Sequence, residues 1–285
     1  MSDGDWFTVD RRPWTKSSIR DLKHAIMNGN SQTGILSYQD VSLWYGSALV
    51  LITDRIRSSF SRTQRDEIDV SSRVKTIDTL RAKLLRQPDY AINRIHDVMG
   101  VRIVADMGLD RQNEITRQIC KSFDKTQISD LRDDSHSGYR AVHVAVILPG
   151  SVCAEIQIRT TLQDDWANCY ELAADIFGRE IRYGDYPSDK TQNDIVCMLQ
   201  KLSDMQIAHF ENTNTHFTNL KTEATKIFAK LDGMKNLDED VIKLRNTLVE
   251  YILHGTQITN EKQQDIRKNI QGFRNMLETY SSESK

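Results

Sequence analysis

The chain has 285 residues, of which 39% are apolar and 27% are charged, and its formal net charge is -2. This length and composition predict a soluble globular protein with a sizeable core. The near-neutral charge excludes a global attraction to nucleic acid or to membranes, so any such binding must come from a local patch.

No apolar run approaches the roughly 20 residues that span a bilayer, and the polar start at Met1 is unlike a signal peptide. We therefore expect a cytoplasmic protein with no membrane partner. The four cysteines form no C-x-x-C pair, which favours a reduced protein over a disulfide framework or a zinc site. They are Cys120, Cys153, Cys169 and Cys197.

The first part of the chain predicts helices before a first strand. A polar arm over 1–15 precedes a short helix at 16–28. Apolar residues recur at helical spacing over 38–60, which predicts an amphipathic helix. A short, partly β-branched run at 68–75 is followed by a helical segment at 77–85.

The middle of the chain alternates between strand and helix patterns. The apolar run at 98–104 suits a buried strand, and 111–123 reads as a helix. Two strands at 139–148 and 152–159 are joined by a Pro-Gly turn, and an amphipathic helix follows at 161–178. We expect the aromatic residues of that last helix to lie in a core rather than to contact a cofactor.

Beyond residue 188 the composition becomes almost entirely helix-forming. We expect three or four helices over 190–280, with breaks near 233 and 255. The predicted fold class is α+β. We divide the chain into an N-terminal arm and helices at 1–64, a mixed core at 65–187 and a helical C-terminal extension at 188–285.

A cluster of basic residues surrounds the first helix of the core. A helix that begins at residue 76 places Lys83 about two turns beyond Lys75, so several cations can approach one anion. Such a cluster is either a solvated helix face or a site for a polyphosphate, which Arg and Lys bind well. Its members are Arg73, Lys75, Arg81, Lys83 and Arg86.

Asp97 precedes the apolar strand that contains Arg102. An arginine inside such a strand must find a partner, because burying an unpaired charge is costly. The two residues form either a structural ion pair or part of a magnesium site, since Mg²⁺ prefers one or two carboxylates plus phosphates. His96 and Asp97 also suggest a metal phosphohydrolase, but the other histidines lack ligand-like spacing to them.

Two consecutive strands carry the residues most indicative of chemistry. Gly138 allows a close turn before Tyr139, which either stacks on a base or packs in a core. His143 follows four residues later and would share a strand face with Tyr139. On the next strand Glu155, Gln157 and Arg159 occupy one face, because strand side chains alternate. The types on that face suggest a polyanionic substrate and a general base or metal ligand.

In combination these motifs resemble the synthetase domain of RelA/SpoT-type alarmone synthetases, over about residues 73–183. The resemblance implies a nucleotidyltransferase-like mixed sheet surrounded by helices. It also implies an ATP-dependent pyrophosphokinase that transfers pyrophosphate to a ribose 3′-hydroxyl. The motifs are Arg73-x-Lys75 with Lys83, Asp97-x-x-Gly100-x-Arg102, Gly138-Tyr139-x-x-x-His143, and Glu155-x-Gln157-x-Arg159-Thr160.

The resemblance also implies roles for residues at the ATP half of the site. Arg73 and Arg102 would hold the adenine from both faces. Lys75 and Lys83 would bind the phosphates of ATP. Asp97 would hold Mg²⁺, the expected cofactor.

At the acceptor half, Glu155 would share the metal or take the proton from the acceptor hydroxyl. Tyr139 would stack on the acceptor base, and three residues would lie close to the acceptor: His143, Gln157 and Arg159. Phosphoryl-type transfer relies mainly on positioning and charge neutralisation, which this set supplies.

Two features depart from relatives that make guanosine alarmones. Asp164 stands where relatives usually carry His or Asn. The segment 130–136 lacks the usual lysines and offers only Arg132 and His136 as cations. The pattern over 162–184 is more similar to the toxic small alarmone synthetases of toxin–antitoxin systems, several of which modify the 3′ end of tRNA.

The acceptor is therefore expected to be GDP or GTP, giving (p)ppGpp, with the 3′ CCA end of tRNA as the main alternative and an adenine nucleotide as a third. A tRNA backbone would be bound elsewhere, for instance by the basic residues of 11–23. A catalytically inactive nucleotide sensor is a further alternative, which the presence of both Asp97 and Glu155 disfavours. The C-terminal helices would either pack on the core, bind an antitoxin or form a homo-oligomer.

Overall fold

The computed structural model describes residues 6–133, 137–234 and 237–283. Among them, no helix combines the length and apolar character needed to cross a bilayer. The chain groups into two compact units. The first comprises Met1–Asp106, Gln112–Asp130 and Ala141–Arg159, and the second comprises Met107–Arg111, Leu131–Arg140 and Thr160–Lys285.

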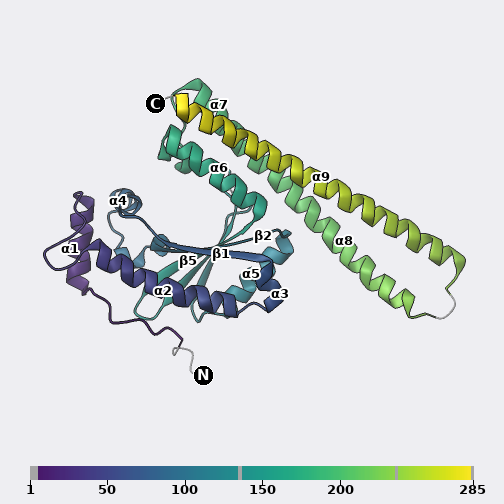
Figure 1. Ribbon diagram of the computed structural model, residues 1–285, viewed down its shortest axis with the longest axis horizontal. Helices are drawn as coiled ribbons and strands as arrows, with labels where there is room; N and C mark the ends of the chain where they lie inside the picture. Colours follow the sequence, from purple (N-terminus) through teal and green to yellow (C-terminus); the bar gives the residue numbers. More distant parts are fainter. Residues whose placement is uncertain (1–5, 134–136, 235–236, 284–285) are drawn as a thin grey trace. The chain divides into compact units, whose positions relative to one another are not determined.

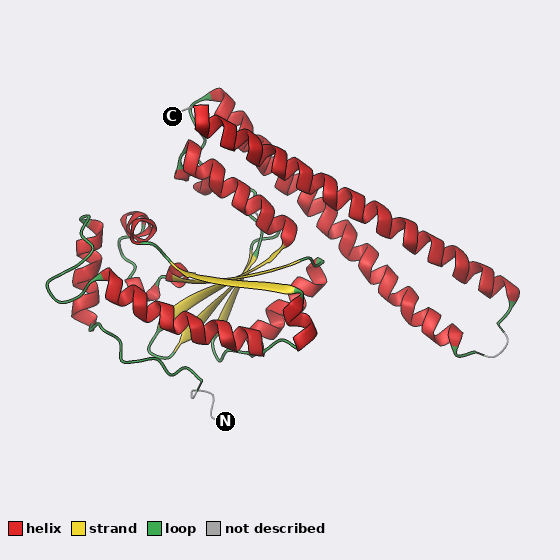
Figure 2. Ribbon diagram, viewed as in Figure 1, coloured by secondary structure: helices red, strands yellow, loops and turns green. Residues whose placement is uncertain are grey.

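The first unit is a five-stranded mixed sheet with helices (Figures 1 and 2). The strands lie in the order β1-β2-β5-β4-β3. They are β1 (Ile68–Val74), β2 (Met99–Ala105), β3 (Thr126–Asp130), β4 (Val142–Leu148) and β5 (Val152–Thr160). The helices are α1 (Lys16–Met27), α2 (Tyr38–Ser58), α3 (Arg62–Asp66), α4 (Ile77–Arg86) and α5 (Leu109–Lys121), with 3₁₀ turns η1 (Ile92–Arg94) and η2 (His96–Val98).

The two faces of this sheet differ in burial. In β2 every second residue from Met99 to Ala105 is buried, and the residues between them are half-buried. α2 lies across one face and packs on β1 and β2 (Figure 1). Its apolar residues, such as Ile52, are fully buried together with Ile103 of β2 and Ile156 of β5. The alternate set of strand residues, including Arg102 and Glu155, is therefore the less covered one.

The second unit is helical (Figure 2). α8 and α9 form a long antiparallel hairpin (Figure 1). The elements are α6 (Thr161–Phe177), a 3₁₀ turn η3 (Arg179–Tyr183), α7 (Lys190–Lys201), a π-helical turn η4 (Leu202–Ile207), α8 (Ala208–Asp232) and α9 (Glu239–Glu283).

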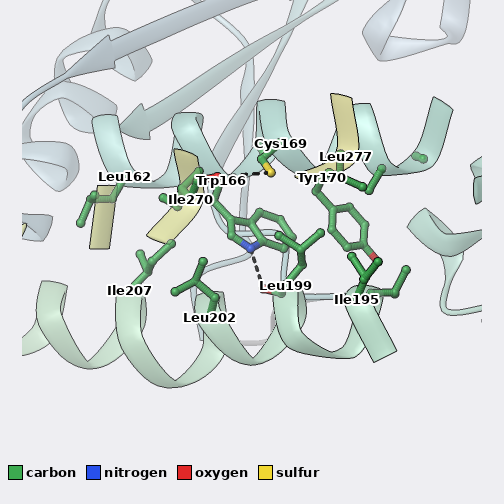
Figure 3. Close-up of a cluster of buried hydrophobic side chains, with 14 of the residues drawn as sticks. Leu162, Trp166, Cys169, Tyr170, Ile195, Leu199, Leu202, Ile207, Ile270 and Leu277 are labelled. Atoms are coloured by element: carbon green, nitrogen blue, oxygen red, sulfur yellow. Dashed lines mark hydrogen bonds between the residues drawn. The ribbon is translucent and has the colours of Figure 1, made fainter. Parts of the chain in front are cut away.

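Trp166 lies at the centre of the core of this unit (Figure 3). Its ring is stacked on Tyr170 at 4.7 Å between centroids, and its Nε1 donates a hydrogen bond to the Leu199 carbonyl at 2.7 Å. Apolar residues of α6, α7, η4 and α9 surround it, including Leu199 and Ile270. The expectation that the aromatic residues of this helix belong to a core is confirmed.

The predicted α+β class with a sheet, surrounding helices and a helical C-terminal part is confirmed. Three details of the sequence analysis are wrong. The strand predicted from residue 139 begins at Val142, three residues later, after a turn in which Ser137 and Gly138 have positive φ. Residue 255 lies inside a continuous α9, and β3 was not predicted. The three-part domain division remains a prediction.

Candidate functional site

Asp97 brings together the two predicted phosphate-binding lysines. Lys75 ends the connection from β1, and Thr76 caps the start of α4, so Lys83 lies two turns along that helix. The Nζ atoms of Lys75 and Lys83 donate to different oxygens of the Asp97 carboxylate, at 2.6 and 2.7 Å. The predicted convergence of cations on one anion is therefore present, with a carboxylate of the protein as the anion.

Both ion pairs are partly shielded from solvent, with side chains 19–25% exposed. Burial alone would raise the pKa of Asp97, but the two ammonium groups outweigh it and lower the pKa below its ordinary value. Asp97 is thus a stable anion at neutral pH. Arg81, from the same basic cluster, lies instead against Gly29.

Arg73 and Arg102 lie on the same face of the β1–β2 pair. In the antiparallel register Arg73 is opposite Gly100, and Ser71 is opposite Arg102. The two arginines are therefore diagonal neighbours, separated across the pair by the missing side chain of Gly100. The register therefore places the two predicted adenine-binding arginines near each other on one face of the pair.

A chain of polar side chains runs along β5. Arg159 Nη2 donates to Gln157 Oε1 at 2.9 Å, and Gln157 Nε2 donates to Glu155 Oε2 at 2.9 Å. The guanidinium fixes the orientation of the amide, because it can only donate and so selects the amide oxygen. The amide NH₂ group is thereby directed at the carboxylate. The predicted sharing of one face by Glu155, Gln157 and Arg159 is confirmed.

His143 joins this chain from the neighbouring strand. In the antiparallel β4–β5 register it is opposite Gln157, and its Nδ1 lies 3.4 Å from Glu155 Oε1. Ala145 is opposite Glu155, so only a small side chain faces the carboxylate across the pair. Each oxygen of Glu155 therefore has a neighbouring nitrogen, and the carboxylate is held in one orientation.

Burial would raise the pKa of Glu155, but His143 and the amide of Gln157 outweigh it and lower the pKa. The charge of Asp97 opposes this lowering, which shows that the two carboxylates are close enough to interact. The two carboxylates are hard oxygen donors of the kind that Mg²⁺ prefers, and the two lysines would have to release Asp97 for it to bind the ion. Among the described residues no group of three or more metal-ligating side chains is found, so phosphate oxygens would complete such a site.

Tyr139 belongs to the second unit, where it is half-buried against the core around Trp166. Gly138 before it has φ +82°, and a Cβ there would lie 2.8 Å from the Trp166 ring. The Gly138 carbonyl accepts a hydrogen bond from Ser203 at 2.5 Å. Glycine is thus required here both by the backbone conformation and by the packing against Trp166, and it fixes the position of the backbone at Tyr139.

The two departures noted in the sequence also fall in the second unit. Asp164 accepts a hydrogen bond from Asn168 at 2.9 Å. The charge of Arg132 acts on the buried carboxyl of Glu211, so this cation lies near a carboxyl of the protein. His136 lies outside the described residues.

Sequence reasoning missed three residues near these groups. Tyr38 donates from its hydroxyl to the Lys75 carbonyl at 2.5 Å, and burial raises its pKa to about 12. Arg94 lies close enough to Cys153, two residues before Glu155, for its charge to act on the thiol. Glu211 accepts hydrogen bonds from the side chains of Thr160 and Gln163, just after Arg159. Of these three residues only Arg94 could have been found from the sequence, because it lies three positions before Asp97.

Comparison with known proteins places the chain in a family. The model of the region found in RelA/SpoT proteins matches residues 72–177. An uncharacterised protein of Mycobacterium tuberculosis is 43% identical over 196 residues, which cover 67% of this chain and 70% of that protein. A GTP pyrophosphokinase of Bacillus subtilis is 31% identical over 113 residues, 34% of this chain and 53% of that protein.

Solved structures share the fold. Small alarmone synthetase 1 of Bacillus subtilis, bound to its product pppGpp, gives a TM-score of 0.50 at 20% identity, over 65% of this chain and 97% of that one. A GTP pyrophosphokinase family protein of Streptococcus pneumoniae gives 0.50 at 22% identity, over 66% and 95%. With the sheet, the motifs and these likenesses together, the chain belongs to the RelA/SpoT family and has the fold of the small alarmone synthetases.

Proposed function

We propose that the protein is an ATP-dependent pyrophosphokinase. A ribose 3′-hydroxyl oxygen attacks the β-phosphorus of ATP, the bond between that phosphorus and the oxygen bridging to the α-phosphate breaks, and AMP leaves. The hydroxyl proton passes to a base of the protein. The observation that carries this proposal is the ionised Glu155, held by His143 and Gln157 and close enough to Asp97 to interact with it.

Glu155 is suited to the role of the base. Its pKa is lowered, so it is unprotonated at neutral pH, and its two oxygens are fixed by the neighbouring strand and by Gln157. A positioned carboxylate of this kind contributes about 10²–10⁴-fold to the rate of proton transfer steps. His143 and Arg159 would hold the acceptor beside it.

Lys75 and Lys83 would exchange Asp97 for the phosphates of ATP. Both ammonium groups already converge on one anion, so they need only small movements to contact a larger one. Arg73 and Arg102, diagonal neighbours on one face of the β1–β2 pair, would hold the adenine. A fixed set of cations around the transferring group stabilises charge in the transition state.

Asp97 and Glu155 would hold Mg²⁺, with Glu155 either sharing the metal or acting solely as base. When bound, the ion supplies charge neutralisation on the transferring phosphates. Both carboxylates are ionised and lie close together, which supports this assignment.

We propose GDP or GTP as the acceptor, so that the product is a guanosine alarmone, (p)ppGpp. Support comes from the 31% identity with a GTP pyrophosphokinase over 113 residues. Tyr139 would stack on the guanine. The 3′ end of tRNA is the second candidate. Cations of segment 130–136 would be needed to bind the 5′-phosphates of GDP or GTP. Arg132, the described cation of this segment, acts instead on the carboxyl of Glu211.

The test is incubation of the purified protein with Mg²⁺ and β-labelled ATP, offering GDP, GTP, AMP, ADP and deacylated tRNA in parallel. Label in a guanosine product supports the proposal. Label on tRNA or on an adenine nucleotide confirms the reaction and overturns the acceptor. ATP binding without transfer to any acceptor overturns the enzymatic proposal in favour of a nucleotide sensor.

Glu155→Gln separates the role of the base from that of the fold. It keeps the shape of the side chain and should lower turnover by about 10²–10⁴-fold, while ATP binding persists. The control is Glu67→Gln, an exposed carboxylate at the end of α3, which should leave turnover unchanged. Full turnover in Glu155→Gln would refute the assignment.

A further inference from the structure

The hairpin of α8 and α9 has an exposed apolar face. Six large apolar residues on or next to these two helices recur at heptad spacing and are between 51% and 72% exposed. We name them the hairpin stripe. They are Leu220, Ile227 and Met234 on α8 or just past its end, and Leu244, Tyr251 and Ile258 on α9. In each half the residues are seven apart, which is the repeat of a helix that packs against another helix.

The stripe is distinct from the seam that joins α8 to α9. Along α8 the seam contains Phe217 and Ala224, which are half-buried and buried. Along α9 it contains Gly255, whose added Cβ would lie 2.5 Å from the Phe217 ring. Each stripe residue follows a seam residue by three positions, so the hairpin's own contact leaves the stripe uncovered.

Both halves of the stripe lie on one face of the hairpin. In an antiparallel helix pair, positions with the same offset from the seam point to the same side. A hollow of about 450 Å³ shows this rule for the other side, since most of its lining residues stand one, four or five positions after a seam residue on both helices. They include Thr218, Lys221, Thr222 and Thr225 of α8, and Thr259 and Asn260 of α9. The hollow and the hairpin stripe therefore lie on opposite faces of the hairpin.

The two halves also occupy the same stretch of the hairpin. Phe217 lies against Gly255, and Arg245 forms an ion pair with Asp232 at 2.8 Å. Each half spans the same length of helix. A two-fold axis along the hairpin would set the α8 half of one copy against the α9 half of another, in antiparallel orientation.

The charges of this region allow identical faces to meet. The segments 220–234 and 244–258 contain four basic and three acidic side chains, with both signs on each helix. A nearly balanced surface does not repel its own copy, and it offers no net charge to attract a nucleic acid or a strongly charged protein. Six side chains exposing on the order of 100 Å² each give about 600 Å² per copy, near the ~800 Å² per partner of a standard interface.

We propose that the hairpin stripe is the interface of a homodimer, in which two hairpins form a four-helix bundle. Two antiparallel helices with a heptad-spaced apolar face are half of such a bundle. The proposal is independent of the catalytic activity, because none of its residues lies in the candidate site.

The test is the mass of the full chain in solution, by light scattering over a range of protein concentrations. We expect twice 32.8 kDa. The double variant Ile227→Glu/Tyr251→Glu should give a single chain with unchanged helical content. The matched control Thr222→Glu/Asn260→Glu adds the same charges to the opposite face and should remain dimeric.

If the wild type has the mass of a single chain, the proposal is overturned, and the hairpin stripe would instead bind a protein of different sequence. A dimer that survives the stripe substitutions would also overturn it. Cross-linking of mixed ¹⁴N- and ¹⁵N-labelled wild-type protein tests the interface without a variant. Links between Lys226 or Lys230 of one copy and Lys243 of the other are expected, and inter-copy links confined to the first unit would contradict the interface.

Discussion

Asp97 and Glu155 are both ionised, but partners of different kinds hold them. Asp97 is held by two ammonium groups on flexible side chains, and an anion of higher charge, such as a polyphosphate, can attract these groups away from it. Glu155 is held by an amide whose own orientation is fixed by Arg159. The first arrangement suits a site that exchanges a carboxylate for phosphates, and the second suits a group that must remain in place.

The surroundings of Glu155 could be predicted from the sequence better than those of Asp97. Glu155, Gln157 and Arg159 are two residues apart on one strand, so alternation alone placed them on one face. The Lys75–Asp97 contact joins residues 22 positions apart and depends on how β1 and β2 pair. The sequence left Asp97 with a choice between Arg102 and a metal, because periodicity carries no information about such a contact.

The ion pairs of Asp97 predict a dependence of stability on pH. The pKa of Asp97 is lowered in the folded protein, mainly by Lys75 and Lys83 against the effect of burial. The pairs therefore stabilise the fold above the ordinary Asp pKa of about 3.9, and this stabilisation is lost as pH falls through the lowered value. Asp97→Asn should cost about 1–3 kcal/mol of unfolding free energy at pH 7, and the cost should shrink in acid.

Urea unfolding at a series of pH values measures this difference. Asp54→Asn, an exposed carboxylate on α2, is the control and should change stability by less than about 0.5 kcal/mol at every pH. A cost for Asp97→Asn that stays constant down to acid pH would show that the ion pairs are not its cause.

Tyr139 gives a prediction about substrate affinity. Its ring is partly buried on the core around Trp166, yet it is proposed to stack on the acceptor base. Tyr139→Ala should raise the acceptor KM by about 5–150-fold, because stacking on a base is worth about 1–3 kcal/mol. The KM for ATP should change far less. Tyr139→Phe keeps the ring and should restore the acceptor KM, whereas equal increases for both substrates would refute the stacking role.

At the scale of elements, long and strongly periodic segments were predictable and weakly apolar ones were not. The helices at 16–28 and 38–60 were predicted within a few residues of α1 and α2. β3 has the sequence Thr-Gln-Ile-Ser-Asp, is exposed except at its first residue and forms an edge of the sheet. A polar edge strand has no buried face and therefore no alternation to detect.

Gly255 shows the opposite error. A glycine in a helical pattern is often a break, because it lacks helix propensity. Here it stays helical, since the Phe217 ring occupies the place of its side chain. The benefit of close packing depends on α8, and no local pattern around residue 255 reveals it.

Glu211 gives a prediction for the junction of α6 and α8. It is 3% exposed, and its oxygens accept from Thr160 at 2.5 Å and from Gln163 at 3.0 Å. Thr160 and Gln163 also form the capping box of α6. Glu211→Ala should cost about 2–4 kcal/mol, because it leaves two buried donors without this acceptor and opens a cavity.

The control is Glu223→Ala on the same helix, where the carboxylate pairs with Lys226 in an exposed position. Thermal unfolding should show a large loss for Glu211→Ala and almost none for Glu223→Ala. Similar small losses in both variants would mean that Glu211 does not anchor the start of α6.

At the scale of the molecule, the N-terminal arm is part of the first unit. Trp44 Nε1 donates to the Asp10 carbonyl at 2.8 Å, and Trp14 lies against Trp44 with centroids 5.0 Å apart. From the sequence we predicted that this segment is an arm and that its basic residues are candidate contacts for tRNA. Arg12 is instead directed at the backbone of the turn between β4 and β5, 138 residues further along the chain.

The last prediction concerns the contribution of Arg12 to stability. Its two terminal nitrogens donate to the carbonyls of Pro149 and Gly150, both at 2.8 Å, and a Cβ on Gly150 would lie 1.5 Å from the guanidinium. The turn and the arm therefore stabilise each other, and β5 carries Glu155 away from this turn. Arg12→Ala should cost about 1–2 kcal/mol, which lowers Tm by roughly 2–4 °C per kcal/mol in a protein of this size. Arg11→Ala removes the same charge from an exposed neighbour and should leave Tm unchanged. If both variants lost the same few degrees, net charge rather than the contact with the turn would be responsible.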